Sequence, residues 1–208
     1  MAHMKTTTLN AHSFRMIENG VISCIPVTPL VMQEQEWTLE WRVGSAVDKE
    51  KIIDSLERLL KGNDDALDFL RQRAALMLDE MLENALFAAP RDSEGKQLLY
   101  DRNNRDILPD EQITLRCSFD GDRLFLEVSD SWGSLSPETV QSFIAMNLSS
   151  DGTEIDRRGR GIYFMWHFMD DFYVSVKPGE KTSIGGNLLL YPNSNENGAE
   201  NNGRYFQN

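Results

Sequence analysis

The sequence predicts an α+β fold, a two-layer sandwich in which helices cover one face of a mixed, mostly antiparallel sheet. The first observation is the order of patterns along the chain: strand, helix, helix, strand, strand, helix, loop, helix, strand, strand. The second is a tight-turn signal within each of the two later strand pairs, which favours antiparallel neighbours. The third is an apolar fraction of 40% over 208 residues, which suffices for the core of one domain.

The first part of the predicted domain is a strand followed by two helices. Residues 37–43 alternate apolar and polar side chains and are rich in β-formers, which predicts a half-buried strand. Apolar residues recur at helical spacing over residues 48–61, and the glycine that follows predicts the end of that helix. Asn63 or Asp64 is the expected N-cap of a longer helix that runs to about Ala89, where a proline ends it.

The second part follows a polar loop over residues 90–110 and consists of two hairpins and two helices. Asp120-Gly121 and Pro178-Gly179 are the expected hairpin turns. Residues 147–160 are rich in Ser, Gly, Asp and Arg, a composition typical of a mobile loop. In chain order, the expected elements are strands at 113–119 and 123–129, helices from 137 to about 146 and from 161 to 169, and strands at 172–176 and 183–191.

We expect three parts of the chain. Residues 1–36 form an N-terminal arm, which begins with Met1–Met4, typical of a cloning remnant, and contains a short strand candidate at 21–25. Residues 37–191 form the folded domain. Residues 192–208 carry six Asn in 17 positions, which predicts a flexible tail.

Charge and composition exclude several functions. There are 21 Lys and Arg against 33 Asp and Glu, a net charge of −12, which disfavours binding to nucleic acid or to an anionic membrane surface. No apolar run of about 18 residues predicts a membrane span, and no secretory signal pattern is visible. Cys24 and Cys117 stand far apart and outside any CxxC pair, which indicates reduced thiols and a cytoplasmic protein.

The long predicted helix carries the first candidate site. On a helical wheel, Glu80 and Asn84 share one edge of the buried face, whereas Asp79 and Glu83 fall on the solvent side. A carboxylate and an amide oxygen in this position are suited to orient a water or hydroxyl group and to ligate Mg²⁺. Because acidic faces are common on solvated helices, an ordinary amphipathic helix is the alternative.

Two more candidate motifs lie at the ends of predicted elements. Asp130 ends a strand shortly before Gly133, where its carboxylate can accept a hydrogen bond from an exocyclic amine such as adenine N6; an ordinary turn is the alternative. Gly159 and Gly161 flank Arg160 at a loop-to-helix junction, which exposes backbone N–H groups to an anion. Arg160, like the two arginines just before it, can neutralise phosphate, and a flexible basic loop is the alternative.

In this order and spacing, the motifs resemble the N, G1 and G2 boxes of the GHKL ATPase superfamily, and within it the anti-sigma-factor Ser/Thr kinase branch of the histidine-kinase-like ATPases. The matches are Glu80-x-x-x-Asn84 to E-x-x-x-N, Asp130 with Leu135-Ser136-Pro137 to D-x-G-x-x-F-D-P, Gly159 to Met165 with Met169-Asp170 to G-R-G-L-x-L-M…M-D, and Thr182 to the Thr of G-T-x-V. The resemblance covers roughly residues 37–191 and implies the Bergerat fold of these ATPases.

The resemblance implies an ATP site with Mg²⁺, for which residues 147–160 would be the lid. The implied roles are general base for Glu80, Mg²⁺ ligand for Asn84, adenine contacts for Asp130, Gly133 and Thr182, and close approach to the phosphates for Gly159 and Gly161. Trp132 departs from the pattern, because it stands where the first G1 glycine is expected and would stack on the base or block the pocket. Ala88 and Lys181 also depart from residues expected in the family.

Two functions stay open at this point. One is an ATP-dependent protein Ser/Thr kinase that phosphorylates a partner such as a STAS-domain anti-sigma antagonist, with sigma-factor binding as the second activity known in the family. The other is a degenerate module that binds proteins without catalysis, which Trp132 favours. Members of the family often form homodimers. An acidic α+β domain unrelated to the family is the remaining alternative.

Overall fold

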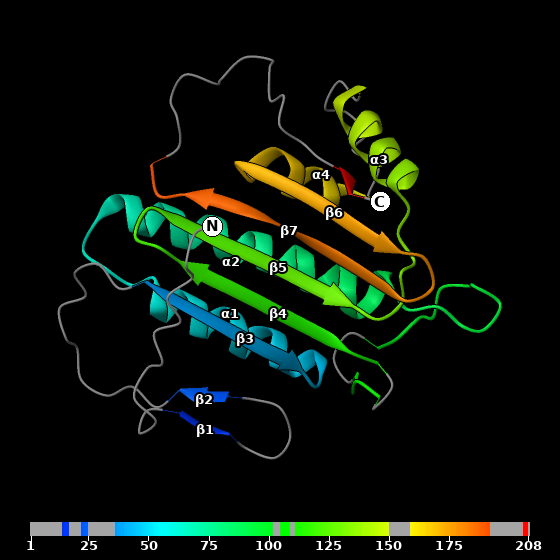
Figure 1. The fold of residues 1–208 in the computed structure, drawn as a ribbon, viewed down its shortest axis with the longest axis horizontal. Coiled ribbons are helices and arrows are strands. Elements are labelled where there is room, and N and C mark those ends of the chain that lie inside the picture. The colour runs from blue at the N-terminus through cyan, green and yellow to red at the C-terminus, as the bar shows by residue number, and fades with distance from the viewer. Residues whose placement is uncertain are drawn as a thin grey trace, which may run out of the picture.

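Five antiparallel strands form the central sheet of the computed structural model, and α1, α2 and α4 lie behind it in the view of Figure 1. The structure describes residues 36–101, 105–108, 111–149 and 159–191, together with the backbones of three short strands at 14–16, 22–24 and 206–207. The sheet order is β3-β4-β5-β7-β6, and the short β8 adds to β6 in parallel. The predicted α+β sandwich is confirmed at this level.

The bounds of most elements agree with the expected ranges to within a few residues. The strands are β1 (Phe14–Met16), β2 (Ile22–Cys24), β3 (Trp37–Val43), β4 (Ile113–Phe119), β5 (Arg123–Asp130), β6 (Asp171–Lys177), β7 (Lys181–Leu189) and β8 (Phe206–Gln207), and the helices are α1 (Ala46–Leu59), α2 (Asp65–Glu83), the π-helical η1 (Asn84–Ala88), α3 (Pro137–Ser149) and α4 (Arg160–Phe168).

The two hairpins form at the turns expected from the sequence. Gly121 has φ 97° and Gly179 has φ 70°, left-handed conformations that glycine adopts without strain. At the first turn, the Asp120 carboxylate accepts a hydrogen bond from the Arg123 backbone N–H at 2.8 Å. The resulting register sets Asp130, the last residue of β5, directly opposite Thr182 on β7.

Helix α2 provides the long amphipathic element between the sheet and solvent. It begins at Asp64, whose side chain accepts a hydrogen bond from the Ala66 backbone N–H at 2.9 Å, as expected of an N-cap. The predicted apolar stripe is buried against the sheet, with Leu70, Ala74, Met77, Leu78 and Met81 all at most 1% exposed. This packing fixes which edge of the helix faces the carboxyl end of β5.

The helical run that starts with α2 ends at Ala88, close to the expected Ala89, but its last turn is π-helical. The α-helical pattern ends at Glu83, and Asn84–Ala88 forms a π-helical turn in which the Ala89 backbone N–H donates to the Asn84 carbonyl at 2.8 Å. A π turn inserts one extra residue into a helical turn, is rare, and often occurs at functional sites. The widened turn begins at a candidate site residue.

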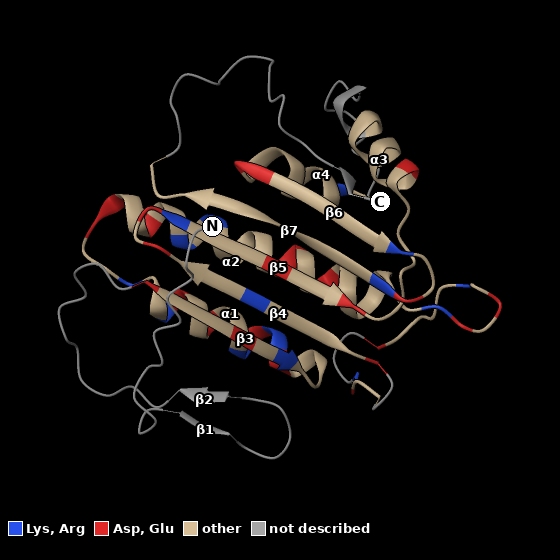
Figure 2. Ribbon diagram, viewed as in Figure 1, with Lys and Arg blue, Asp and Glu red and all other residues tan. Residues whose placement is uncertain are grey.

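Charged residues lie opposite one another on β3, β4 and β5, where Figure 2 shows red and blue bands on neighbouring strands. Arg116 on β4 contacts Glu40 at 2.8 Å and Glu127 at 3.6 Å, and the Tyr173 hydroxyl donates to Glu127 at 2.5 Å. Tyr173 reaches across β7 because residue 185 is glycine, whose added Cβ would lie 2.7 Å from the tyrosine oxygen. The glycine therefore leaves room for the hydrogen bond by which Tyr173 of β6 reaches Glu127 of β5.

Some expectations fall outside the described residues. These are most of the arm at 1–36, most of the tail at 192–208 and the part of the lid from 150 to 158. Within the described part of the chain, α3 continues three residues past its expected end. No helix in the described ranges combines the length and apolar character needed to cross a membrane.

Candidate functional site

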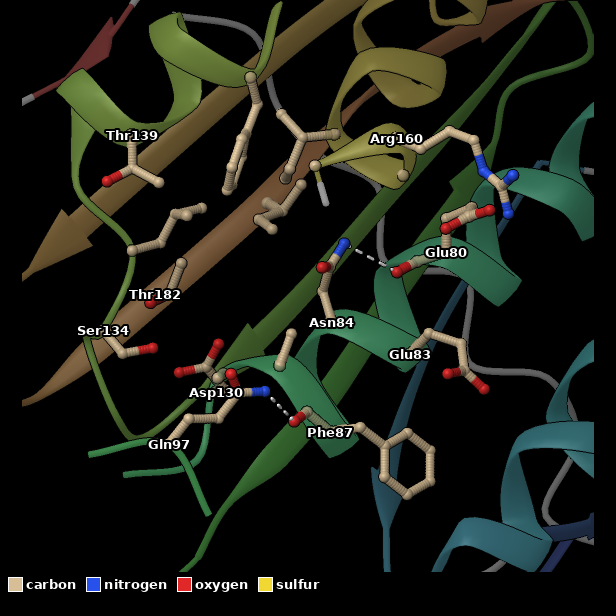
Figure 3. Close-up of a pocket in the computed structure, with 18 of the residues that line it drawn as sticks. Glu80, Glu83, Asn84, Phe87, Gln97, Asp130, Ser134, Thr139, Arg160 and Thr182 are labelled. Carbon is tan, nitrogen blue, oxygen red and sulfur yellow. Dashed lines mark hydrogen bonds between the residues drawn. The ribbon is translucent and has the colours of Figure 1, made fainter. Parts of the chain in front are cut away.

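A cavity of about 660 Å³ lies where α2, η1, the end of β5 and the start of α4 meet (Figure 3). Its volume is within the range of about 300–1,000 Å³ that is typical of small-molecule sites. Seven of the eight residues expected to form the site line this cavity: Glu80, Asn84, Asp130, Gly159, Arg160, Gly161 and Thr182. Segments far apart in the sequence thus meet at one place.

Glu80 is the carboxylate of the cavity nearest the start of α4. Burial raises the pKa of Glu80, and the negative charges of Asp79 and Glu83 raise it further, against the opposing effects of Arg160 and Lys49. Figure 3 shows the Arg160 side chain extended toward Glu80. A carboxyl group with a raised pKa is a stronger base when it is ionised.

Lys49 of α1 neutralises part of this acidic wall. Its ammonium group lies 2.8 Å from Asp79 and 2.7 Å from Glu83, and these contacts raise the pKa of Lys49 against the effect of burial. The wheel placed Asp79 and Glu83 on the solvent side, but both line the cavity. Glu83 in particular is only 23% exposed, because α1 packs beside α2 and brings the lysine over it.

Asn84 lies one helical turn after Glu80. Its side-chain Nδ2 donates to the Glu80 backbone carbonyl at 2.9 Å, as drawn in Figure 3. Because the donor is committed in this way, the amide oxygen Oδ1 is the atom with which Asn84 can bind a cation or a donor in the cavity.

Asp130 and Thr182 form the polar base of the cavity on adjacent strands. They are 6% and 2% exposed, respectively. Burial raises the pKa of Asp130 to about 6, although hydrogen bonds from the Trp132 and Gly133 backbone N–H groups lower it. The buried Thr182 Oγ1 makes no hydrogen bond to any described residue. Both side chains retain capacity to bind a polar ligand.

The first turn of α4 approaches the other walls through two glycines. A Cβ on Gly161 would collide with Glu80 Oε2, and a Cβ on Gly159, which has φ 74°, would collide with the Phe143 ring on α3. Gly159 is the N-cap and has no side chain to cap the first N–H groups of α4. These groups lie at the edge of the cavity, where a helix N-terminus favours an anion.

Gly133, the eighth expected residue, does not line the cavity. It has φ 57°, and its carbonyl accepts a hydrogen bond from the Gly179 backbone N–H at 3.2 Å. A Cβ there would lie 2.7 Å from both the Gly179 and the Glu180 nitrogens. The glycine is thus needed where the segment after β5 packs against the β6–β7 turn.

Trp132 also lies outside the lining of the cavity. Its ring packs partly against the core, and the Arg105 Cζ lies 5.3 Å from the ring centroid. In this structure the ring contacts Arg105 and does not fill the cavity, while the two alternatives for its effect on a bound base, stacking or blocking, stay predictions.

Sequence reasoning missed the wall made by the residues after Asn84. Phe87, Ala88, Arg91 and Gln97 line this end, with Gln97 Nε2 donating to the Phe87 carbonyl at 3.0 Å. Arg91 Nη1 donates to the Ala88 carbonyl at 2.6 Å and so caps the end of the helix. Residues 90–110 have no periodic pattern, so nothing in the sequence signals that this loop folds back onto the cavity.

No protein-family model matches the sequence, and no curated protein matches it. The chemistry of the cavity must therefore be judged from its own side chains. Within the described ranges, no group of three or more His, Cys, Asp or Glu residues is arranged to hold a metal ion. The single amide oxygen of Asn84 fits a hard cation that takes its other ligands from a bound phosphate and from water.

Proposed function

We propose that the chain binds Mg-ATP in this cavity and transfers the γ-phosphate to a Ser or Thr hydroxyl of a protein partner. The proposal places it among the GHKL ATPases, with a likeness to the anti-sigma-factor Ser/Thr kinases. The observation that carries it is the meeting of three motifs around one cavity: the Glu80–Asn84 pair, the Asp130–Thr182 pair and the glycine-bounded start of α4.

The Asp130–Thr182 end suits an adenine base. Above a pH of about 6, the Asp130 carboxylate is mostly ionised and can accept a hydrogen bond from the N6 amine. The Thr182 hydroxyl, which lacks a well-formed hydrogen bond among the described residues, can bond to a ring nitrogen directly or through water. Ile184 and Leu135 supply apolar contacts in the same lining.

The opposite end suits the phosphates. The first N–H groups of α4, to which the N-cap Gly159 offers no side-chain cap, favour negative charge, and Arg160 adds a guanidinium at the same edge. Asn84 Oδ1 would hold Mg²⁺, which supplies neutralisation of the charge that develops on the phosphate oxygens. The small protein donor set fits this cation, since Mg²⁺ commonly keeps phosphate and water as most of its ligands.

Glu80 is the proposed catalytic base. In the transfer step, the partner's hydroxyl oxygen bonds to the γ-phosphorus, and the bond from phosphorus to the β–γ bridging oxygen breaks. ADP leaves with that electron pair, and Glu80 takes the proton from the hydroxyl. Its raised pKa increases its basicity, while positioning and charge neutralisation account for most of the rate in such transfers.

The partner is proposed by likeness to the family: a STAS-domain anti-sigma antagonist, or a sigma factor that is bound rather than phosphorylated. The competing function is a protein-binding module without catalysis. Replacing Glu80 by Ala separates the two, because phosphate transfer should collapse in a kinase while partner binding should survive in a module.

Calorimetric titration with ATP, with and without Mg²⁺, tests the binding step. We expect micromolar, Mg²⁺-dependent binding that Asp130→Ala abolishes. Asp54→Ala is the matched control, because Asp54 lies on the outer face of α1 with a side chain 61% exposed and should bind as the wild type does. Absence of binding at millimolar ATP would refute the proposal.

A further inference from the structure

Arg105 is a buried cation that the proposed chemistry does not use. Its side chain is 1% exposed, and Nη2 donates to Glu111 Oε1 at 3.1 Å. Its Cζ lies 4.0 Å from the Tyr100 ring centroid and 5.3 Å from that of Trp132. Nε and Nη1 have no hydrogen-bond partner in the described part of the chain, so the two aromatic rings are its main further contacts.

The position of Arg105 is fixed from several sides. Its carbonyl accepts a hydrogen bond from the Ala46 backbone N–H at 2.8 Å, which ties the segment to the start of α1. Glu111 is held in turn, because its Oε2 accepts from the Leu108 backbone N–H at 3.0 Å and its Oε1 accepts from the Tyr100 hydroxyl at 3.4 Å. These contacts fix the guanidinium in the place where the Trp132 ring lies against it.

Trp132 is the ring held by this support, and it lies on the segment that builds the candidate site. Its backbone N–H donates to Asp130 Oδ1 at 2.9 Å. Asp130 and Ser134, two residues before and two residues after it, both line the cavity. A rotation of the Trp132 side chain away from Arg105 would thus carry a large apolar ring toward the place proposed for the base.

We propose that Arg105 is a positioning residue that holds the Trp132 ring outside the cavity and so keeps the site open to a nucleotide. The inference rests on the proposed function for its effect on binding, but the position of the ring is independent of any nucleotide. Release of the ring would lower the apparent affinity in proportion to the open fraction. A ring that fills the cavity for about nine tenths of the time would weaken binding about tenfold.

The test compares four proteins: the wild type, R105Q/E111Q, W132G, and the triple variant that combines them. The paired glutamines remove the buried cation without leaving the Glu111 charge alone. We expect R105Q/E111Q to bind ATP about tenfold more weakly, and we expect the triple variant to recover the affinity of W132G. The proposal is overturned if the paired variant binds as the wild type does, or if removal of Trp132 fails to restore binding.

A second readout follows the ring itself. Fluorine NMR on fluorotryptophan-labelled protein gives one resonance for each of the four tryptophans, and W132G assigns that of Trp132. We expect this resonance to shift in R105Q/E111Q and to stay in place in the control R116Q/E40Q, which removes a similar pair from the sheet face. An unmoved resonance overturns the proposal, even where the wild type binds no ATP and the proposed function has failed.

The paired variant must also fold, and Arg105→Lys covers the case in which it does not. Lysine keeps a positive charge beside Glu111 but loses the planar guanidinium that packs on the rings. The Arg105→Lys variant should shift the Trp132 resonance and weaken ATP binding, as R105Q/E111Q is expected to do. If a folded Arg105→Lys protein shows neither of these two changes, the role assigned to Arg105 is overturned.

Discussion

Replacing Asp130 by Asn should prevent the loss of stability that the wild type shows as the pH rises from about 4 to about 7, and should also remove the proposed contact to the adenine base. Burial raises the pKa of this carboxyl from 3.8 to about 6. The folded state therefore binds the proton more tightly than the unfolded state does, so stability falls as the pH rises between these two values. A difference of this size corresponds to roughly 3 kcal/mol of unfolding free energy, and the whole amount is lost only when the pH exceeds about 7.

Urea denaturation at a series of pH values measures this effect. About half of this amount falls between pH 5 and pH 8, and the wild type should lose that half relative to Asp130→Asn over that interval. Asp54→Asn, on the exposed face of α1, should follow the wild-type curve. Parallel curves for the wild type and Asp130→Asn would refute the reasoning, because they would mean that burial does not destabilise the ionised carboxylate.

Three more substitutions test other contacts. Gly161→Ala should keep the unfolding free energy within about 1 kcal/mol, since alanine favours helices, but should displace Glu80 and reduce phosphate transfer about 100-fold; equal transfer rates would contradict this. Gly185→Ala should lower the unfolding free energy by about 1–3 kcal/mol, because the added methyl group would displace the Tyr173 side chain that crosses β7. An unchanged midpoint of urea denaturation would contradict this. Lys49→Met removes a charge that lowers the pKa of Glu80, so the acidic limb of a pH–rate profile should move to higher pH.

Periodicity and turn chemistry account for the parts of the fold that the sequence predicts well. Residues 37–43 alternate because one face of β3 is buried, and Asp120-Gly121 turns the chain because few other pairs adopt its backbone angles. Glu80 and Asn84 could be placed on one edge of a helix for the same reason: helical geometry is local. Because the apolar stripe of α2 is buried against the sheet, the edge that carries Glu80 and Asn84 lines the cavity.

Local patterns carry no information on the contacts that complete the site. The π turn at Asn84 changes the hydrogen-bond spacing without an obvious composition signal. The Trp132 ring contacts Arg105, 27 positions earlier, and the wall at Gln97 belongs to a loop without periodicity. Such contacts are decided by which segments the sheet topology brings together, and that information is spread over the whole chain.

The charges of the cavity explain why the proposed substrate needs a cation. Asp79, Glu80, Glu83 and Asp130 all line it, against Arg91 and Arg160, and only two of the acids are paired with Lys49. Polyphosphate entering alone would meet Glu80 at the place where α4 comes closest to α2. ATP should therefore bind at least about tenfold more weakly when a chelator removes Mg²⁺ than when Mg²⁺ is present. Replacing Glu80 by Gln should reduce this ratio of affinities. Equal affinity with and without Mg²⁺ would mean that the phosphates lie elsewhere, and that Asn84 has no cation to hold.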